Sequence, residues 1–275
     1  MMRPWHLANP VALWRHFAAH RYLLFCLVRR EVQLRYRGSW LGPVWSLLTP
    51  LLMLGVYTFV FSVVFQSKWS SDEPQSKVDF ALTLFASLTA FNVFAETVGA
   101  APGLILANTN YVKRVVFPLE LLPLARLLSN LVQSGFSFAI FIVAVVLVRG
   151  SICWTLVFLP LVMLPLALLT LGCAYFISSL GVFVRDIGQV VGLVITMLMF
   201  LSAVFYPLKS LPSQLQPVLG MNPLVGIVED VRRVTLMGLM PNWPMWAGLT
   251  LFSTLLALAG LLWFMKSKNA FADVL

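Results

Sequence analysis

Long, nearly uninterrupted runs of apolar residues alternate with short polar connections along most of this chain. A helix needs about 20 consecutive apolar residues to cross the hydrocarbon of a bilayer, because each residue adds about 1.5 Å to its length. Six runs reach that length, and they predict an all-α integral membrane protein with six transmembrane helices. The predicted spans are residues 44–65, 80–101, 119–148, 152–180, 187–206 and 245–265.

Two regions depart from the pattern of a plain spanning helix. Pro160 and Pro165 lie inside the fourth run, and because each proline removes a backbone donor, we expect a kink or a break there. Residues 207–244 mix prolines with apolar residues and are too many for a simple turn. We expect them to form short re-entrant helices in the outer leaflet, with Pro223 starting one helix and Gly238 ending it.

Residues 10–28, before the first span, place apolar side chains at helical spacing, with Arg15 and Arg21 turned away from that stripe. This pattern predicts an amphipathic helix in the membrane interface, which serves either as an anchor or as a docking surface for a cytoplasmic partner. Gly38 and the Leu41-Gly42-Pro43 step redirect the chain into the membrane. The predicted division is a cytoplasmic N-terminal segment, 1–43, and a six-span membrane domain, 44–275.

Composition and charge support a membrane location and indicate an orientation. With 60% hydrophobic and 11% charged residues, the chain has too little polar surface to cover a soluble globule of 275 residues. Seven arginines precede the first span, against the single acid Glu31, so the positive-inside rule predicts that the N-terminus is cytoplasmic. An even number of spans returns the C-terminus to the same side. The net charge of +9 gathers beside apolar runs, which indicates contact with anionic membrane lipid and argues against nucleic acid.

The sequence offers little chemistry of its own. It has no G-x-x-x-x-G-K-[ST] loop, so we expect it to depend on a separate ATPase. His16 and His20 are four residues apart, but no carboxylate or cysteine lies near them in the sequence, so we expect neither a metal site nor a cofactor in this chain. A membrane-embedded glycosyltransferase or hydrolase, the alternative from another class, needs an acidic or nucleophilic centre that the sequence does not offer. We therefore predict that the chain is not an enzyme.

Three segments together resemble the permease subunits of ABC type-2 exporters, in particular the group that exports O-antigen, capsule and teichoic-acid polymers. They are LRYRGSWLGPVWSLLTPLL at 34–52, NTNYVKRVVFPLELLPLARLL at 108–128, and FVRDIGQVVGL at 183–193 with the later FYP and NPL elements. The resemblance implies a multi-pass homodimer in the cell inner membrane. It also implies two copies of an ATPase subunit, which would hold ATP and Mg²⁺, and a lipid-linked polysaccharide that passes between the subunits. An ABC type-2 permease for a drug or a lipid is the alternative.

The resemblance gives the loop before the first span a place near the cytoplasmic mouth. Arg35, Tyr36, Arg37 and Trp40 would there form a cytoplasmic entrance and meet a pyrophosphate-linked lipid or the first sugars. Guanidinium forks match phosphate oxygens, and aromatic faces suit sugar rings. Anchoring to lipid headgroups is the alternative interpretation.

In the resembled family, the segment that corresponds to residues 108–117 docks into the ATPase. Tyr111, Lys113 and Arg114 are therefore candidates for coupling ATP hydrolysis to transport. A basic loop that only follows the positive-inside rule is the alternative.

Two further predictions concern the interior of the spans. Glu96 and Arg126 lie about 9–12 Å from the cytoplasmic ends of consecutive spans, and we expect them to pair because an isolated charge in hydrocarbon is unfavourable. Aromatic side chains on three spans could line a substrate channel in which sugar rings slide without fixed hydrogen bonds, although ordinary packing is the alternative. These candidate channel residues are Tyr57, Phe61, Phe91, Phe94 and Phe200.

Overall fold

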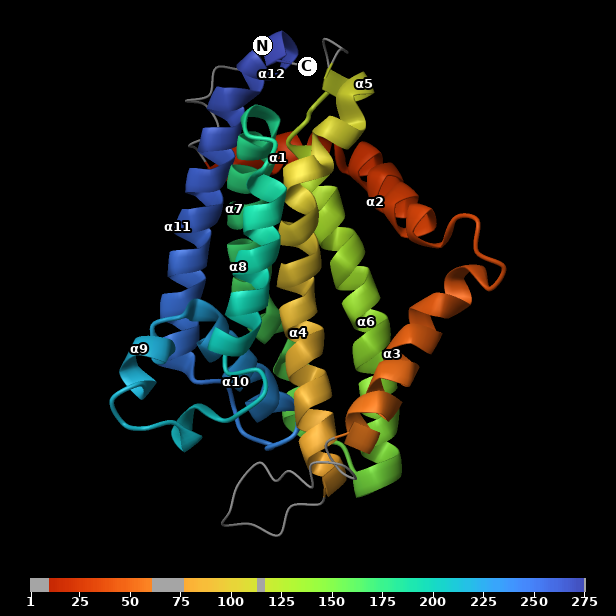
Figure 1. Ribbon diagram of the computed structural model, residues 1–275, viewed down its shortest axis with the longest axis vertical. Coiled ribbons are helices and arrows are strands. Elements are labelled where there is room, and N and C mark those ends of the chain that lie inside the picture. Colours follow the sequence, from red (N-terminus) through yellow and green to blue (C-terminus); the bar gives the residue numbers. More distant parts are fainter. Residues whose placement is uncertain (1–9, 61–76, 113–116, 275) are drawn as a thin grey trace.

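A computed structural model describes residues 10–60, 77–112 and 117–274 of the chain, and every regular element in these ranges is helical (Figure 1). Four helices are long and apolar enough to cross a membrane, which confirms four of the six predicted spans by length. They are α4 (Lys77–Leu104), α6 (Leu121–Arg149), α7 (Leu159–Phe183) and α11 (Trp243–Ser267). The short helices α1 (Pro10–Ala19) and α12 (Phe271–Val274) lie at one end of this bundle, and α9 (Gln216–Gly220) and α10 (Pro223–Thr235) lie at the other (Figure 1).

The first and fifth predicted spans correspond to shorter helices. α3 (Trp45–Tyr57) leads into residues outside the described part of the chain. α8 (Ile187–Leu201) has 15 residues, about 22 Å of helix against about 30 Å of hydrocarbon. We predicted this helix to continue to Tyr206, but it stops where the side-chain amide of Asn222 donates to the carbonyl of Leu201 at 3.3 Å and to the Ser202 hydroxyl at 3.1 Å. Helix length alone therefore does not establish six spans.

The fourth run is not broken at Pro160 or Pro165. A 3-10 turn, η5 (Trp154–Phe158), passes directly into α7, and Pro160 falls in the first turn of that helix, where a missing backbone donor is tolerated. α7 then continues through Pro165 without ending.

The segment between α8 and α11 contains short helices, as we predicted. Pro223 opens α10, and the side-chain oxygen of Asn222 caps this helix by accepting the Leu224 backbone N–H at 3.0 Å. Gly238, with φ of +66°, turns the chain away soon after α10 ends. α10 buries most of its residues and packs on α4, α7 and α11. Its placement within a membrane leaflet stays a prediction.

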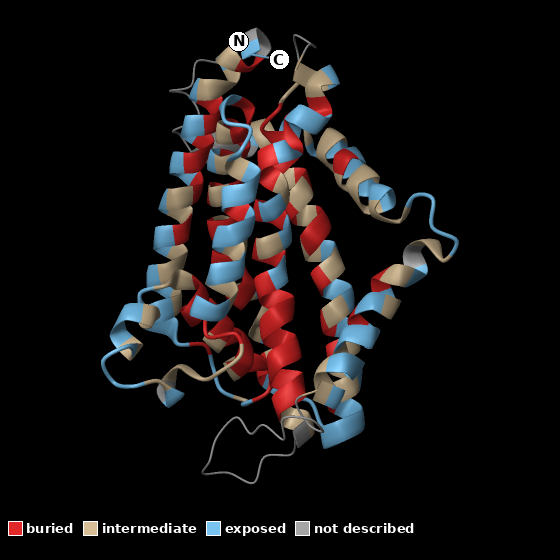
Figure 2. Ribbon diagram, viewed as in Figure 1, coloured by how far each residue is buried: buried red, intermediate tan, exposed pale blue. Residues whose placement is uncertain are grey.

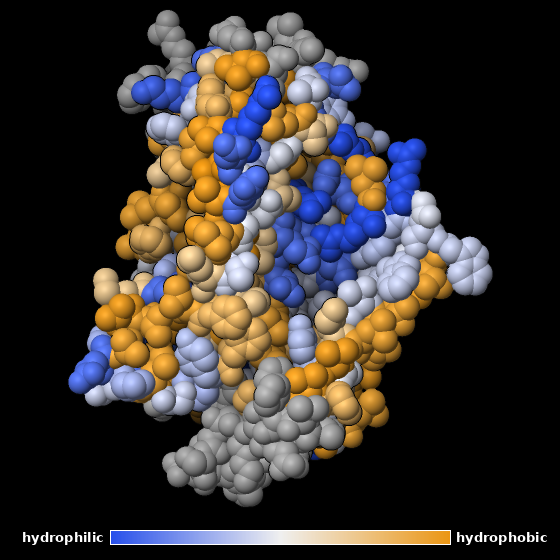
Figure 3. All heavy atoms as spheres, in the orientation of Figure 1, coloured by the Kyte–Doolittle hydropathy of each residue, from blue (hydrophilic) through white to orange (hydrophobic). Residues whose placement is uncertain are grey.

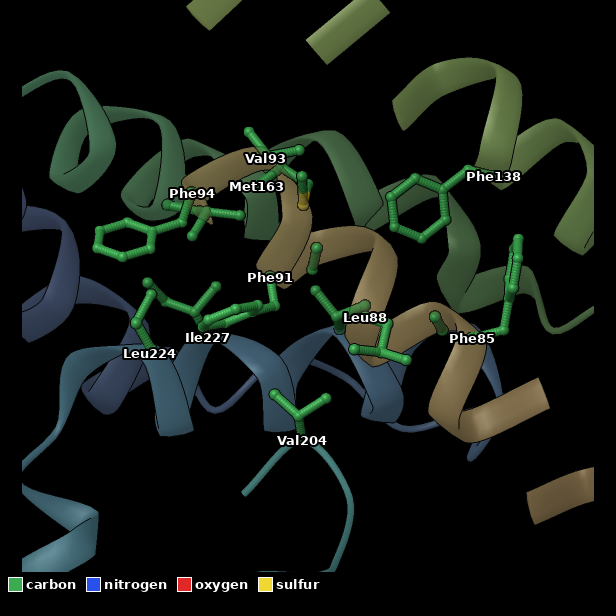
Figure 4. Packing of buried hydrophobic residues seen from close by; sticks show 14 of the residues in the cluster. Phe85, Leu88, Phe91, Val93, Phe94, Phe138, Met163, Val204, Leu224 and Ile227 are labelled. Carbon is green, nitrogen blue, oxygen red and sulfur yellow. The ribbon is translucent and has the colours of Figure 1, made fainter. Parts of the chain in front are cut away.

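The main core lies around α4, whose residues 81–91 are all buried (Figure 2). Phe85, Phe91 and Phe138 pack there against side chains of α7 and α10 (Figure 4). α7 and α11 approach more closely still, because Gly172 and Gly260 face each other: a Cβ added at Gly172 would lie 2.8 Å from backbone atoms of α11. The absence of side chains at these glycines lets the two backbones touch.

The N-terminal segment forms two helices instead of the single one that we predicted. α1 ends at Ala19, and α2 (Arg21–Tyr36) then packs along α6. The chain reverses at Gly38 and Gly42, whose φ angles of +82° and +50° favour glycine, and continues through η2 (Gly42–Val44) into α3. α2 therefore leads away from the bundle and α3 leads back to it, and the turn between them is the part farthest from the bundle (Figure 1).

Candidate functional site

A cavity of about 450 Å³ opens between α2–α3 and α4–α6. We call it the polar cleft, because hydroxyl, amide and charged groups make up much of its wall. Figure 3 shows hydrophilic surface gathered in this hollow beside α2. Its polar lining comes from α2 to α3 (Arg35, Tyr36, Ser39, Thr49), α4 (Thr89, Asn92, Glu96) and α6 (Asn130, Gln133, Ser134, Ser137), and the aromatic rings of Trp45, Tyr57 and Phe85 complete it.

Arg35 joins three helices across the polar cleft. Its Nη2 donates to Glu96 Oε2 of α4 at 2.6 Å and to Asn130 Oδ1 of α6 at 2.7 Å. The amide nitrogen of Asn130 donates in turn to the Thr97 hydroxyl at 2.8 Å, which fixes the amide orientation. The side chains of Arg35 and Glu96 remain 24% and 44% exposed. The charge pair is therefore neutralised within the protein but can still be reached from the cleft.

Tyr36 makes a second connection beside the first. Its hydroxyl donates to Gln133 Oε1 at 2.5 Å, and Gln133 Nε2 donates to the carbonyl of Ser46, at the start of α3, at 3.2 Å. Burial raises the pKa of Tyr36 above its ordinary value, so the phenol stays protonated and keeps its role as a donor. Together the two connections tie the ends of α2 and α3 to α6.

Glu96 and Arg126 do not form the pair that we predicted. Glu96 bonds to Arg35, and Arg126 Nη1 donates to Glu31 Oε2 at 3.1 Å. Glu31 and Arg35 are four residues apart and therefore share one face of α2, which packs against the bundle. The prediction failed because it ended the N-terminal helix at residue 28 and considered only charges inside the spans, whereas α2 continues to Tyr36 and brings Glu31 and Arg35 to the bundle. An i, i+4 acid–base pair on an amphipathic helix was the signal in the sequence.

The structure brings together only two of the four predicted entrance residues. Arg35 and Tyr36 lie in the polar cleft. Arg37 is exposed, and Trp40, at 98% exposure, extends from the turn between α2 and α3 and does not line the cleft. Asn130 and Gln133, which we did not single out, are the residues that hold Arg35 and Tyr36 in place.

Tyr111, the first predicted coupling residue, lies in the short helix α5 (Thr109–Val112). Arg30 of α2 donates to its hydroxyl at 2.5 Å and to Asn108 Oδ1 at 2.8 Å, and its guanidinium lies 5.4 Å from the tyrosine ring centroid. The ring also stacks on Phe117 at 4.2 Å. The side chain of Tyr111 is thus fixed by contacts with Arg30 and Phe117 of the same chain. The sequence did not reveal Arg30 as its partner. Lys113 and Arg114 lie outside the described residues.

The predicted channel aromatics separate into different environments. Tyr57 lines the polar cleft. Phe91 and Phe94 are only 1% and 5% exposed, belong to the core under α10 and do not line the polar cleft (Figure 4). Phe200 is 55% exposed on α8 and stacks on Phe205 at 5.4 Å, away from the cleft. Phe61 falls outside the described residues.

The histidine pair has a partner that we did not foresee. His16 Nε2 lies 2.8 Å from the Glu120 carboxylate, which is distant in the sequence. His20 Nδ1 instead donates to the backbone carbonyl of His16 at 2.8 Å, so the two rings do not converge on a common point. Among residues 10–60, 77–112 and 117–274, no three histidine, cysteine or acidic side chains gather as metal ligands.

Comparison with known sequences adds a family to this geometry. The profile described as "ABC-2 type transporter" matches residues 22–236, from α2 to the end of α10, and so includes the whole polar cleft. The chain belongs to the ABC-2 type transporter family. This confirms the resemblance seen in the three sequence segments. It makes the chain a membrane permease by family, and the long apolar helices are therefore its membrane spans.

Curated relatives of this ABC-2 type transporter match it over shorter stretches. The O-antigen export system permease protein RfbA of Myxococcus xanthus is 33% identical over 121 residues, which are 44% of this chain and 44% of that protein. The protein of the same name from Klebsiella pneumoniae is 28% identical over 116 residues, 42% of this chain and 40% of the relative. The chain therefore matches less than half of the length of each relative.

Proposed function

We propose that this ABC-2 type transporter is the permease subunit of an ATP-driven exporter, which moves a lipid-linked polysaccharide such as O-antigen or capsule across the cell inner membrane. The observation that carries the proposal is the polar cleft, which places hydrogen-bonding side chains beside aromatic rings between membrane helices. The relatives named as O-antigen export permeases support the same substrate class.

The chemistry of the cleft suits sugars better than lipids or drugs. The amide of Asn92 offers both a donor and an acceptor, which match the hydroxyl groups of a sugar. The rings of Trp45 and Tyr57 offer apolar faces for sugar C–H groups. The charges of Arg35 and Glu96 compensate each other, so neither would hold a passing polymer tightly. A permease for an apolar lipid or drug would have little use for the hydroxyl, amide and charged side chains that line the cleft.

The proposal includes partners that the chain needs but does not contain. The sequence has no phosphate-binding loop for ATP, so two copies of a separate ATPase subunit would supply the energy. Under the positive-inside rule, the arginines of the N-terminal helices support a cytoplasmic location for α1, α5 and α12, where such a subunit could dock. α3 and α8 bury few of their residues, and a second copy of the chain would cover them in a homodimer.

Deletion of the gene, followed by analysis of the polymers outside and inside the cell, tests this function. We expect one surface polysaccharide to disappear and its lipid-linked form to accumulate in the cell. Return of the wild-type gene should restore export, whereas Asn92→Leu should restore it poorly, because the substitution removes an exposed amide from the cleft lining. Gln214→Leu is the control, since Gln214 is an exposed amide in the segment before α9, outside the cleft lining. Unchanged surface polysaccharide together with altered drug resistance or lipid distribution would favour the alternative ABC-2 permease.

A further inference from the structure

Glu120 is a buried carboxylate at which both ends of the chain meet. The residue is 2% exposed. Its Oε1 lies 2.8 Å from Nε2 of His16 in α1, and its Oε2 accepts from Nζ of Lys268, in the 3-10 turn η7 (Lys268–Ala270) that precedes α12, at 3.3 Å. Its backbone carbonyl accepts the hydroxyl of Tyr175 from α7 at 3.0 Å. One residue therefore contacts three elements that are far apart in the sequence.

Glu120 lies between α5 and α6 in the sequence, so its contacts connect both of these helices to the rest of the junction. It stands directly before α6 and three residues after Phe117, whose ring stacks on Tyr111 of α5. Tyr111 and Asn108 are in turn bonded to Arg30 of α2. The connection from α4 to α6 is thus held on one side by α2 and on the other by α1, η7 and α7. These elements gather at the same end of the bundle (Figure 1).

A separate small core supports this junction. It includes Leu27 of α2, Ile105, Leu121, Phe264 of α11 and Phe271 of α12, and it is distinct from the main core around α4. Phe271 is completely buried, so the helix that follows Lys268 is packed in place. Apolar contacts thus hold these elements together beside the polar contacts of Glu120.

The charge of Glu120 calls for another explanation, because burial of a carboxylate is unfavourable unless charged hydrogen bonds compensate for the lost water. Apolar contacts are not directional and allow two packed helices to shift slightly relative to each other. Ionic hydrogen bonds fix both the distance and the direction between their two groups. A carboxylate that binds one group from each chain end keeps both ends in register with the start of α6. α6 then continues as one helix to Asn130 and Gln133, which lie in the polar cleft.

We propose that Glu120 is a positioning residue for energy coupling, which carries a displacement of the α5 segment to both chain ends, to α7 and, through α6, to the polar cleft. This inference rests on the proposed function, in which an ATPase docks at α5. Glu120 does not contact the substrate in this mechanism. It keeps the cytoplasmic end of the permease moving as one body, so that each ATP hydrolysed advances the substrate.

The test uses the complete complex of the permease and its ATPase, reconstituted in vesicles with the polymer that the deletion experiment identifies. The measured quantity is the amount of polymer moved per ATP hydrolysed. Glu120→Gln preserves size and one acceptor oxygen but removes the charge and the second acceptor. It should lower this ratio about fivefold or more, which is the low end of typical coupling between sites. The exchange of Glu120→Lys with Lys268→Glu should recover part of the ratio that Glu120→Lys alone loses.

A gentler pair of variants covers the case in which Glu120→Gln does not fold. Lys268→Met removes one partner, whose side chain is 27% exposed, and should also lower the ratio. Lys266→Met is the matched control, because Lys266 is an exposed lysine two residues earlier. Equal ratios for the two lysine variants, or a normal ratio for a folded Glu120→Gln complex, would overturn the role of Glu120 and leave the exporter intact. Failure of the wild-type chain to bind an ATPase or move polymer would overturn the proposed function and this inference with it.

Discussion

The two sides of the α4 helix are built in opposite ways. On the packed side, α7, α10 and α11 close around an apolar core, and the backbones of α7 and α11 touch at Gly172 and Gly260. On the open side, α2 and α3 diverge, and side-chain hydrogen bonds from Arg35 and Tyr36 span the polar cleft between them and the bundle. We therefore expect the packed side to supply most of the stability and the open side to tolerate changes in its contacts.

The charged residues follow the same division. Arg232, on the packed side, is fully buried and donates to Ser87 of α4 and to two backbone carbonyls. Arg35, on the open side, keeps a quarter of its side chain exposed. Because water screens exposed ion pairs and not buried ones, the same type of side chain should contribute very differently to stability in the two places. Four substitutions test this difference, from the largest expected effect to the smallest.

Arg232→Met should destabilise the protein most. The guanidinium donates to the carbonyls of Ala203 and Val204 at 2.6 and 2.7 Å, and its loss would leave buried acceptors without a donor. Burial lowers the pKa of Arg232 to about 10, which still leaves it charged at neutral pH. We expect the free energy of unfolding to fall by about 3–5 kcal/mol. Unfolding of the purified protein in detergent measures the change, with the partly exposed Arg233→Met as control. Equal losses for the two variants would contradict the special role of the buried group.

Gly172→Val should be the next most damaging change. Its side chain would press on backbone atoms of Leu256 and Ala257, which cannot rotate away as a side chain can. We expect a loss of about 1–3 kcal/mol from overpacking. Gly192→Val is the matched control in α8, because a Cβ there has open space within 4 Å. A stable Gly172→Val variant would show that α7 and α11 can separate easily, and the contrast between the two sides would lose its main support.

Glu96→Gln addresses the open side. Since the Glu96 side chain is 44% exposed, loss of its ion pair with Arg35 should lower the free energy of unfolding by no more than about 1 kcal/mol. Under the proposed function, export should fall much more than stability, because the uncompensated Arg35 would hold anionic groups in the cleft. Unfolding in detergent and surface polysaccharide are measured on the same variant. A stability loss as large as that of Arg232→Met would mean that the open side also carries the fold.

Trp40→Ala should have the smallest effect on stability. The indole is 98% exposed, so its removal should change the free energy of unfolding by about 0.5 kcal/mol or less. Membrane association and export of this variant separate the two predicted roles. Loss of export with normal membrane insertion would support the entrance role, and normal export would favour headgroup anchoring.

Local features of the sequence predicted the parts of the fold that depend on local physics. The apolar runs gave α4, α6, α7 and α11, because hydrophobic length is set by the bilayer and needs no knowledge of neighbours. The start of α10 at Pro223 and the reversal at Gly38 and Gly42 followed from backbone constraints of proline and glycine. The predicted length of α8 was too long, because Asn222, which is distant in the sequence, caps the helix at Leu201.

The candidate site was predictable only in part. Arg35 and Tyr36 were identified from the sequence, and the structure places both in the polar cleft. Their partners Asn130 and Gln133 gave no signal, because an amide in an apolar helix does not reveal which neighbour it faces. Phe91 and Phe94 were assigned to a passage on the basis of residue type, but α10 covers their face of α4.

The sequence by itself determined that this chain is a helical membrane permease of the ABC-2 type. Apolar length, charge bias and family segments are properties of contiguous stretches of residues, so they can be identified without knowledge of the fold. Only the tertiary structure decided that Glu96 pairs with Arg35, that Arg126 pairs with Glu31 and that Glu120 joins the two ends of the chain. The physical reason is that a charge inside a protein bonds to whichever partner the packing brings within about 3 Å, and the packing of α2 against α6 fixes the rotation of both helices.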